Sequence, residues 1–403
     1  MNEIIVQKFG GTSVGSVERI DAVAEIIKKA SQSNRIVVVV SAMGGETNKL
    51  VNLAKNFSDN PDKREFDALV ATGETVSSAL LAMALHSKGL KAKSYSASQI
   101  SMRTTDSFSK AKILDVDAKK ILEVLEEDTI PIITGFQGIT ETGDVTTLGR
   151  GGSDTTAVAI AAQVKAERCD IYTDVDGIYT TDPKIVPNAK KLDSITMEEM
   201  LELAGQGAKV MQTRAVEFAN KYEVPVRVLS SFNEGTGTLI SLKEDTMENA
   251  LVSGIASQKN QVKFTLHGVG DIPGTAFKIL GPISDAEVEV DVIVQNVSVD
   301  GKTDFTFTVS SEDQGTVNKV IQEMNDVEYK ELIVNSDIAK VSLVGVGMRS
   351  QAGVASRAFK ALSEKDVNIQ IICTSEIKIT MVIDESLVDK AVKVLHEEFE
   401  LDK

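Results

Sequence analysis

The chain has 403 residues, of which 42% are hydrophobic and 25% are charged, and its formal net charge is −16 at pH 7. This length predicts two or three domains with ample core, and so acidic a chain is a poor partner for nucleic acid or an anionic membrane, because both require a basic face. No signal peptide precedes the first predicted strand and no apolar run approaches the ~20 residues that span a bilayer, so we expect a soluble, cytoplasmic protein.

The chain opens with a predicted buried strand, Ile4–Phe9, that ends in the turn Gly10-Gly11-Thr12-Ser13. A helix is predicted next, because apolar residues recur at helical spacing at Val17, Ile20, Ala24 and Ile27. A strand, a glycine turn and a helix in succession are typical of a phosphate cradle. Lys8 would reach phosphate oxygens from the strand's end while Gly10 and Gly11 donate backbone N–H groups. The turn is not a Walker loop, since the chain has no G-x-x-x-x-G-K-[ST] sequence.

Short apolar strands then alternate with helical patterns up to about residue 242. The later strands are predicted at 36–40, 91–94, 130–134, 168–173 and 226–229. That alternation predicts a mostly parallel sheet covered by helices on both faces. Ligands of such sheets gather at the carboxyl ends of the strands, and Lys8, Ser41 and the loop after Tyr172 all fall at such ends. We therefore expect these segments to share one site.

The stretch Leu148–Thr156 is rich in glycine, hydroxyl and charged residues and precedes the apolar run Ala157–Ala162. Glycines let backbone N–H groups approach a ligand, and the helix behind them adds its positive end, which is typical of an anion site. The alternative is a polar turn in which Ser153 or Asp154 caps the helix. Further on, a predicted strand enters the loop 173–183, whose Asp, Thr and Tyr residues are suited to hold a nucleoside and Mg²⁺.

A turn-rich stretch at 232–238 and a polar stretch at 241–249 indicate a domain boundary, after which the sequence pattern changes. An internal repeat follows, in which 262–270 matches 339–347. In each copy a glycine, Gly274 or Gly353, opens a helix, and a similar strand comes next, at 288–293 or 367–372. The pattern predicts a βαββαβ unit twice over.

Five motifs in this order resemble the signature set of the aspartokinases: Lys8–Ser13, Ser41–Gly44, Thr72–Glu74, Gly149–Asp154 and Thr173–Pro183. The resemblance covers essentially the whole chain. It implies an α/β amino-acid-kinase catalytic domain at 1–245 and two ferredoxin-like ACT regulatory domains, at 246–335 and 336–403. The implied reaction is transfer of phosphate from ATP, with Mg²⁺, to the β-carboxylate of L-aspartate. It gives 4-phospho-L-aspartate, the first step toward lysine, threonine and methionine, with lysine, threonine or both as inhibitors at the ACT domains.

Such a transfer needs no general base, because the accepting carboxylate is already ionised at neutral pH; positioning and positive charge carry the catalysis. The resemblance makes Lys8, Asp154 and Arg150 the catalytic residues: Lys8 contacts the transferred phosphoryl group, Asp154 orients Lys8, and Arg150 clamps a substrate carboxylate. Glu74 would pair with the substrate's α-ammonium. The alternatives are that Lys8 is a lysine whose amine merely reaches solvent from the strand end, and that Glu74 is a carboxylate on a helix surface.

The remaining site residues follow from the same resemblance. The implied substrate-binding residues are Thr47, Glu74, Arg150, Gly151, Gly152 and Ser153. The implied ATP-binding residues are Lys8, Phe9, Gly10, Gly11, Ser41, Thr173, Asp174, Tyr179, Thr180, Asp182, Lys184, Lys209 and Val210. The implied effector-binding residues are Asp271, Gly274, Ala276, Gln295, Asn296 and Ser298 of the first repeat, facing Asn368, Ile369, Ser375 and Glu376 of the second.

Other residue types suggest no competing chemistry. The three histidines are scattered and interpreted as structural or surface residues, and Cys169 and Cys373 are expected to fill cores. No protein metal site is predicted. The rival hypotheses are a kinase of the same fold acting on glutamate, acetylglutamate, carbamate or a nucleotide, and a non-catalytic amino-acid sensor. ACT repeats normally pair between chains, so a homo-oligomer is expected, and a start within the gene near Met247 would add a regulatory subunit.

Overall fold

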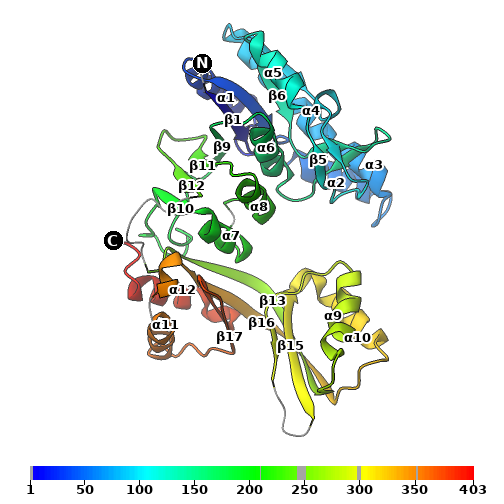
Figure 1. Ribbon diagram of the computed structural model, residues 1–403, viewed down its shortest axis with the longest axis vertical. Coiled ribbons are helices and arrows are strands. Elements are labelled where there is room, and N and C mark those ends of the chain that lie inside the picture. Colours follow the sequence, from blue (N-terminus) through cyan, green and yellow to red (C-terminus); the bar gives the residue numbers. More distant parts are fainter. Residues whose placement is uncertain (1–2, 209, 243–250, 297–300, 351–352) are drawn as a thin grey trace. The chain divides into compact units, whose positions relative to one another are not determined.

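The computed structural model describes residues 3–208, 210–242, 251–296, 301–350 and 353–403. The chain forms two compact units (Figure 1). The first is made of residues within 1–179, 191–205 and 209–247, and the second of residues within 180–190, 206–208 and 248–403. The predicted divisions at 245 and 335 stay predictions. Two segments from inside the predicted catalytic domain, 180–190 and 206–208, belong to the second unit.

The first unit is built on an eight-stranded sheet with the order β10-β12-β11-β9-β1-β2-β6-β3. Among the described strands every neighbouring pair in it is parallel except β11 and β12, as the alternation of strands and helices predicted. Its strands are β1 (Ile4–Phe9), β2 (Arg35–Val40), β3 (Ala92–Tyr95), β6 (Ile130–Thr134), β9 (Arg168–Thr173), β10 (Ser194–Thr196), β11 (Val226–Ser230) and β12 (Thr238–Ser241). A smaller sheet contains β4 (Arg103–Thr104), β5 (Ile113–Asp115), β7 (Gln137–Ile139) and β8 (Val145–Thr147).

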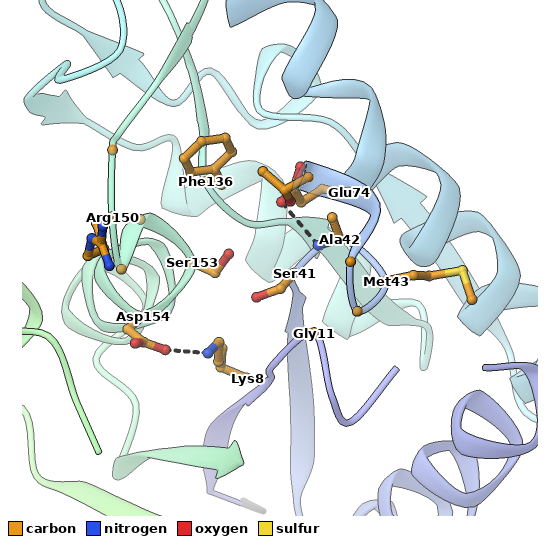
Figure 2. A pocket seen from close by; sticks show the side chains of 16 residues that line it. Lys8, Gly11, Ser41, Ala42, Met43, Glu74, Phe136, Arg150, Ser153 and Asp154 are labelled. Carbon is orange, nitrogen blue, oxygen red and sulfur yellow. Dashed lines mark hydrogen bonds and ion pairs between the residues drawn. The ribbon is translucent and has the colours of Figure 1, made fainter. Parts of the chain in front are cut away.

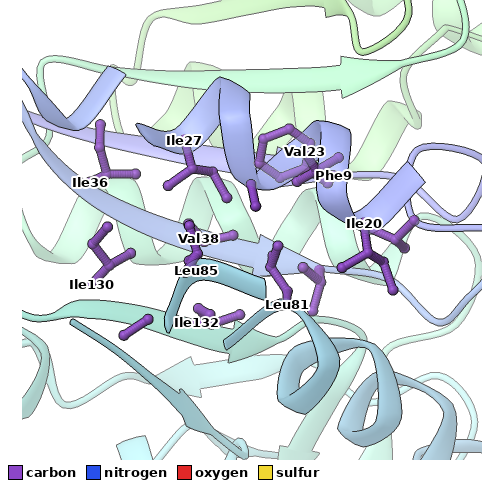
Figure 3. Close-up of a cluster of buried hydrophobic side chains, with 14 of the residues drawn as sticks. Phe9, Ile20, Val23, Ile27, Ile36, Val38, Leu81, Leu85, Ile130 and Ile132 are labelled. Carbon is purple, nitrogen blue, oxygen red and sulfur yellow. The ribbon is translucent and has the colours of Figure 1, made fainter. Parts of the chain in front are cut away.

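Helices cover this sheet because alternate strand residues point to opposite faces. Side chains from β1, β2 and β6 pack with helices α1 (Val17–Ser31) and α4 (Thr72–Ser87) in one core (Figure 3). The buried face of α1 begins at Ile20, one turn later than predicted, since Val17 is 68% exposed. The other helices of this unit are α2 (Glu46–Lys55), α3 (Lys63–Val70), α5 (Ala118–Glu126), α6 (Gly152–Gln163), α7 (Met197–Gly205) and α8 (Thr213–Lys221).

The stretch Lys63–Ser87, which contains α3 and α4, is long and apolar enough to cross a membrane by length and composition alone. Half of the most apolar 18-residue part of this stretch is buried inside the fold. Leu81 and Leu85 of α4 belong to the core of the first unit. The apolar character of this stretch is therefore explained by its packing on the sheet.

The second unit holds a six-stranded sheet with the order β14-β15-β13-β16-β18-β17. Two long strands, β13 (Gly254–Gly270) and β16 (Glu331–Val344), pair antiparallel through its middle. The outer strands are β14 (Ile293–Gln295), β15 (Lys302–Ser310), β17 (Ile371–Thr374) and β18 (Lys378–Asp384). The helices are α9 (Thr275–Asp285), α10 (Gln314–Glu323), α11 (Val354–Ser363) and α12 (Val388–Glu398). Gly274 and Gly353 adopt φ of +94° and +101° at the starts of α9 and α11, as predicted for helix-opening glycines.

The two repeats are not consecutive, self-contained units. The second repeat provides β16, β17 and β18, and the chain ends after α12. Its fourth strand comes from 254–258, which precedes the first repeat and pairs with 340–344. The predicted strands at 288–293 and 367–372 are also misplaced, because the ladders form at Ile293–Gln295 and Ile371–Thr374. Val288 and Val367 are buried in cores that include helix residues. A short apolar run indicates that a segment is buried, but it does not show whether that segment is a strand.

The cysteines differ from each other. Cys169 of β9 is buried, as predicted, and burial raises the pKa of its thiol. Cys373 is exposed on the edge strand β17, so its prediction as a core residue is wrong. Its apolar neighbour Ile372 is also 46% exposed, which explains why the local sequence was misleading.

Candidate active site

A pocket of about 290 Å³ lies in the first unit at the carboxyl ends of β1 and β2. Strand β1 has β2 on one side and β9 on the other, so the chain's connections diverge at β1, where open α/β sheets bind ligands. The pocket is lined by Lys8, Gly11, Ser41, Ala42, Met43, Gly44, Gly45, Thr47, Glu74, Phe136, Gly149, Arg150, Gly151, Gly152, Ser153 and Asp154 (Figure 2).

An ion pair joins Lys8 at the end of β1 to Asp154 in the first turn of α6. The Nζ–Oδ1 distance is 2.5 Å, and the two side chains are 10% and 11% exposed. A carboxylate near a helix N-terminus is stabilised by the helix dipole, and pairing offsets part of the cost of burying both charges. The pair holds an ammonium group at the pocket wall (Figure 2). Lys8 is thus an anchored side chain and not one that simply reaches solvent.

Glu74 in the first turn of α4 is only 3% exposed, so the alternative of a helix-surface carboxylate is wrong. Its Oε1 accepts a hydrogen bond of 3.0 Å from the Ala42 N–H, while Oε2 is buried without a partner among the described residues. Burial raises the pKa of Glu74 to about 7, against the lowering effect of the Ala42 hydrogen bond. A buried carboxylate with one unsatisfied oxygen is suited to receive a cationic group from a ligand.

The close approach of α4 to the loop after β2 depends on a glycine. A Cβ on Gly73 would lie 2.7 Å from the Ala42 Cβ, closer than real side chains approach. Gly135, after β6, has the same role beside Ser153, whose Oγ would lie 2.6 Å from an added Cβ. In Figure 2 the hydroxyls of Ser41 and Ser153 lie between the Lys8–Asp154 pair and Glu74.

Arg150 stands between two glycines in left-handed conformations, Gly149 with φ of +75° and Gly151 with φ of +69°. Gly151 is the N-cap of α6, and its cap has no side-chain hydrogen bond. Neither Ser153 nor Asp154 caps the helix, so the polar-turn alternative is wrong. Both residues instead lie in the first helical turn and line the pocket, at the positive end of the helix dipole.

Ten of the predicted site residues meet in this pocket. They are Lys8, Gly11, Ser41, Thr47, Glu74, Arg150, Gly151, Gly152, Ser153 and Asp154. Phe9 and Gly10 do not line it. Phe9 is fully buried and stacks on Tyr172 with ring centroids 4.7 Å apart. The Gly10 N–H already donates to the Tyr172 carbonyl at 3.1 Å, so it is not free for a phosphate.

The predicted nucleotide loop is divided between the units. Thr173, Asp174, Tyr179 and Val210 belong to the first unit without lining the pocket, and Thr180, Asp182 and Lys184 belong to the second. The Thr180 hydroxyl is bonded to His396 Nε2 at 3.0 Å and is buried there. Lys209 lies outside the described residues.

Sequence reasoning missed Phe136, which lines the pocket two residues after β6. Its φ of +69° is unusual for a residue with a side chain, and two hydrogen bonds hold it there: its N–H donates to Thr156 Oγ1, and its carbonyl accepts from the Leu148 N–H. The available signal was position, because Phe136 follows a predicted strand whose carboxyl end reaches the same edge as Lys8.

The predicted effector residues form two separate groups in the second unit. In the first repeat, Gln295 Nε2 donates to Asp271 Oδ1 at 3.4 Å, and Gly274 begins α9. Asn368, Ile369, Ser375 and Glu376 flank β17, at the opposite edge of the sheet from β14. Within one chain the two groups therefore do not face each other, and the predicted effector site stays a prediction. Ser298 lies outside the described residues.

Comparison with known families and proteins agrees with these features. The amino acid kinase family matches residues 3–230, and an ACT domain family matches residues 341–399. The chain is 56% identical over 402 residues to an aspartate kinase of Stutzerimonas stutzeri, covering 99% of this chain and 98% of that one. It is 48% identical over 409 residues to an aspartokinase of Helicobacter pylori, covering 99% and 100%.

Solved structures give the same result. Escherichia coli aspartokinase III in complex with aspartate and ADP has a TM-score of 0.84 and 28% identity, covering 98% of this chain and 99% of that one. Its complex with lysine and aspartate has a TM-score of 0.77 and 29% identity, with the same coverage. The fold predicted from the motifs, an amino-acid-kinase domain followed by ACT modules, is confirmed. The chain belongs to the aspartokinase family and is an aspartate kinase.

Proposed function

We propose that the pocket binds L-aspartate between Glu74 and Arg150 and places its β-carboxylate against the terminal phosphate of ATP at Lys8. The observation that carries this proposal is that Glu74 Oε2 is buried without a hydrogen-bond partner among the described residues, in a pocket that also holds the Lys8–Asp154 pair. Aspartate has one ammonium group and two carboxylates. Glu74 would receive the ammonium, and the Arg150 guanidinium, whose planar fork suits carboxylates, would hold one carboxylate.

Two anions must meet in this reaction, the β-carboxylate and the terminal phosphate. The Lys8 ammonium lowers the cost of that approach and stabilises the charge on the transferred group, while Asp154 keeps the ammonium in place. The β-carboxylate attacks phosphorus, the bond to the bridging oxygen of ATP breaks, and ADP leaves with that electron pair. The product is the acyl phosphate 4-phospho-L-aspartate.

We propose that Mg²⁺ enters as part of the ATP substrate. No group of three or more His, Cys, Asp or Glu residues that could hold a metal occurs in the parts of the chain that the structure describes. Mg²⁺ in kinase sites is held mainly by substrate phosphates and water, with one or two carboxylates, so a protein cage is not required. The Thr173–Lys184 loop, Lys209 and Val210 stay predicted ATP contacts.

Trapping the product tests this assignment. Hydroxylamine converts an acyl phosphate to a hydroxamate, so aspartyl hydroxamate should form in proportion to ADP. N-acetyl-L-aspartate should not be phosphorylated, because it lacks the ammonium and would leave Glu74 unpaired. ADP release without hydroxamate would contradict a carboxylate acceptor. Equal turnover of the acetylated substrate would contradict the role of Glu74.

We propose that lysine, threonine or both inhibit the enzyme at the ACT modules, so that it is regulated by end products of the pathway that it begins. A relative of the same fold has been solved with lysine and aspartate bound, which supports an amino-acid effector. Asp271 would receive the effector's ammonium beside the Gly274 turn. Activity measured against lysine and threonine, separately and combined, tests this proposal; inhibition by neither would contradict it.

We propose that the protein is a homo-oligomer and that it acts in the cytoplasm. The two groups of predicted effector residues lie at opposite edges of one six-stranded sheet, so a joint site requires a second chain. The edge of β14 in one chain would then lie near the edge of β17 in another. Sedimentation measurements with and without effector test this, and a monomer at all concentrations would contradict it. The start near Met247 stays a prediction, and that residue lies outside the described ones.

A further inference from the structure

The loop that carries Arg150 is short and is closed by one hydrogen bond of its own, from the Gly152 N–H to the Gly149 carbonyl at 3.0 Å. Gly149 and Gly151 both adopt positive φ, and glycine is the residue with the greatest backbone freedom. A guanidinium that must meet a substrate carboxylate at a fixed angle needs a firm base. That base is formed by Thr147 and Leu148, the two residues directly before the loop.

A buried carboxylate holds the first of these residues. Asp67 of α3 is completely buried and accepts four hydrogen bonds through its two oxygens. Two come from Thr147, from N–H at 2.7 Å and Oγ1 at 2.9 Å. The other two come from Ser109, from N–H at 2.8 Å and Oγ at 3.0 Å. Asp67 thus ties the end of β8 to a neighbouring loop and to α3.

An arginine holds the second residue. Arg214 of α8 donates from Nη1 to the Leu148 carbonyl at 2.6 Å and from Nη2 to the Ala111 carbonyl at 2.8 Å. The geometry uses the rigid fork of a guanidinium, which lysine cannot reproduce. The same helix start also reaches the loop itself, since a Cβ on Gly151 would lie 2.1 Å from the Gln212 Cγ.

We infer that Asp67 and Arg214 are positioning residues that hold Thr147 and Leu148 so that Arg150 meets the substrate carboxylate. Neither lines the pocket, so each acts through the loop. The inference rests on the role proposed above for Arg150. It assigns part of substrate selection to α3 and α8, whose contacts with Thr147 and Leu148 span 80 and 66 residues of the sequence.

The test uses Arg214→Met, which keeps much of the side chain's length and removes both donors. The KM for aspartate should rise about 10- to 100-fold while the KM for ATP stays within about twofold, because a displacement of ~1 Å at a clamp has effects of this size. In an Arg150→Ala background the same change should add almost nothing, since coupled residues are not additive. Arg214→Lys keeps a cationic donor group but loses the fork of the guanidinium. Its KM for aspartate should therefore lie between those of Arg214→Met and the parent enzyme.

Arg103→Met is the matched control. Arg103 lies in β4 of the same small sheet, with its side chain 60% exposed, and pairs with Asp115 away from the loop. Its loss should leave both KM values unchanged. Urea unfolding of every variant separates lost stability from lost positioning, and Arg214→Lys decides the matter if Arg214→Met does not fold.

Equal changes in both KM values, or full additivity with Arg150→Ala, would overturn the inference and leave Arg214 a purely structural residue. If Arg150→Ala itself left aspartate binding unchanged, the proposed role of Arg150 would fail instead. Asp67→Ala provides an independent arm, because it removes all four acceptor contacts to Thr147 and Ser109. It should also raise the KM for aspartate selectively, and unchanged kinetics in a folded Asp67→Ala would remove Asp67 from the assignment.

Discussion

The ionisation of Glu74 should control how aspartate binding depends on pH. Its pKa is raised from 4.5 to about 7 by burial, a shift that corresponds to about 3 kcal/mol between the two protonation states at ~1.4 kcal/mol per unit. Only the ionised carboxylate can pair with the substrate's ammonium. In the free enzyme about a tenth of the Glu74 carboxyls are ionised one unit below the pKa, so kcat/KM for aspartate should fall roughly tenfold per pH unit below about 7 and level off above it.

The raised pKa of Glu74 also affects stability, and raising the pH lowers stability while it improves substrate binding. The native state of this group binds a proton more tightly than the unfolded state, so the free energy of unfolding should decrease as pH rises from about 4.5 to about 7. Glu74→Gln removes the buried charge and should be more stable than the parent at pH 8, by at most about 3 kcal/mol. It should nevertheless lose about 10²–10³ in kcat/KM for aspartate, because the ammonium loses its ionic partner.

The assay is ADP release coupled to NADH oxidation from pH 5.5 to 8.5, at saturating Mg·ATP, with hydroxamate formation as the check on product. Glu46→Gln at the start of α2 is the matched control, since Glu46 pairs with Lys49 and does not line the pocket. It should keep the parental profile, whereas Glu74→Gln should give a flat one. A bend near pH 7 that persists in Glu74→Gln would belong to another group and would refute the reasoning.

Three further outcomes are expected. Lys8→Ala should lower kcat by about 10²–10³ with little change in the KM for aspartate, because the ammonium acts on charge that grows in the transition state; steady-state kinetics check this. Asp271→Ala should relieve inhibition by lysine or threonine and leave uninhibited kcat within about twofold, and unchanged inhibition with unchanged effector binding by calorimetry would show the effector site misplaced. Gly73→Ala should lower the free energy of unfolding in urea by about 1–3 kcal/mol and weaken aspartate binding, because its Cβ would overlap Ala42. Gly205→Ala, which has no atom within 4 Å of its Cβ, is the control and should leave both unchanged.

Six of the eight strands of the central sheet could be predicted from short runs of mostly apolar residues, whereas β10 and β12 were not predicted. Strand β1 was placed at its observed bounds, and the motifs after β1 and β2 met at one edge as the parallel arrangement requires. The burial of Glu74 could not be predicted. It results from the contact of α4 with Ala42, 32 residues away in the sequence, which no local pattern encodes.

The arrangement of the second unit was also beyond the sequence pattern. Matching 262–270 to 339–347 assumes that each repeat folds by itself, but the fourth strand of the second repeat precedes the first repeat in the chain. Likewise, the nucleotide loop reads as one motif, yet Tyr179 and Thr180 belong to different units. Chain connectivity and long-range burial decide such questions, and both are properties of the whole fold.

The membership of 180–190 and 206–208 in the second unit bears on how this enzyme could be taken apart or recombined. Val186 is buried in the core of the second repeat together with Ile255 and Leu395, and the Gln206 side chain accepts a hydrogen bond from Ser342 Oγ at 2.9 Å. A fragment ending at residue 245 would expose these side chains to water. In a chimaera that exchanged only the part after residue 245, these side chains would pack against residues of a different protein. Grafting regulation from one relative onto another therefore requires moving these two short segments together with the C-terminal half.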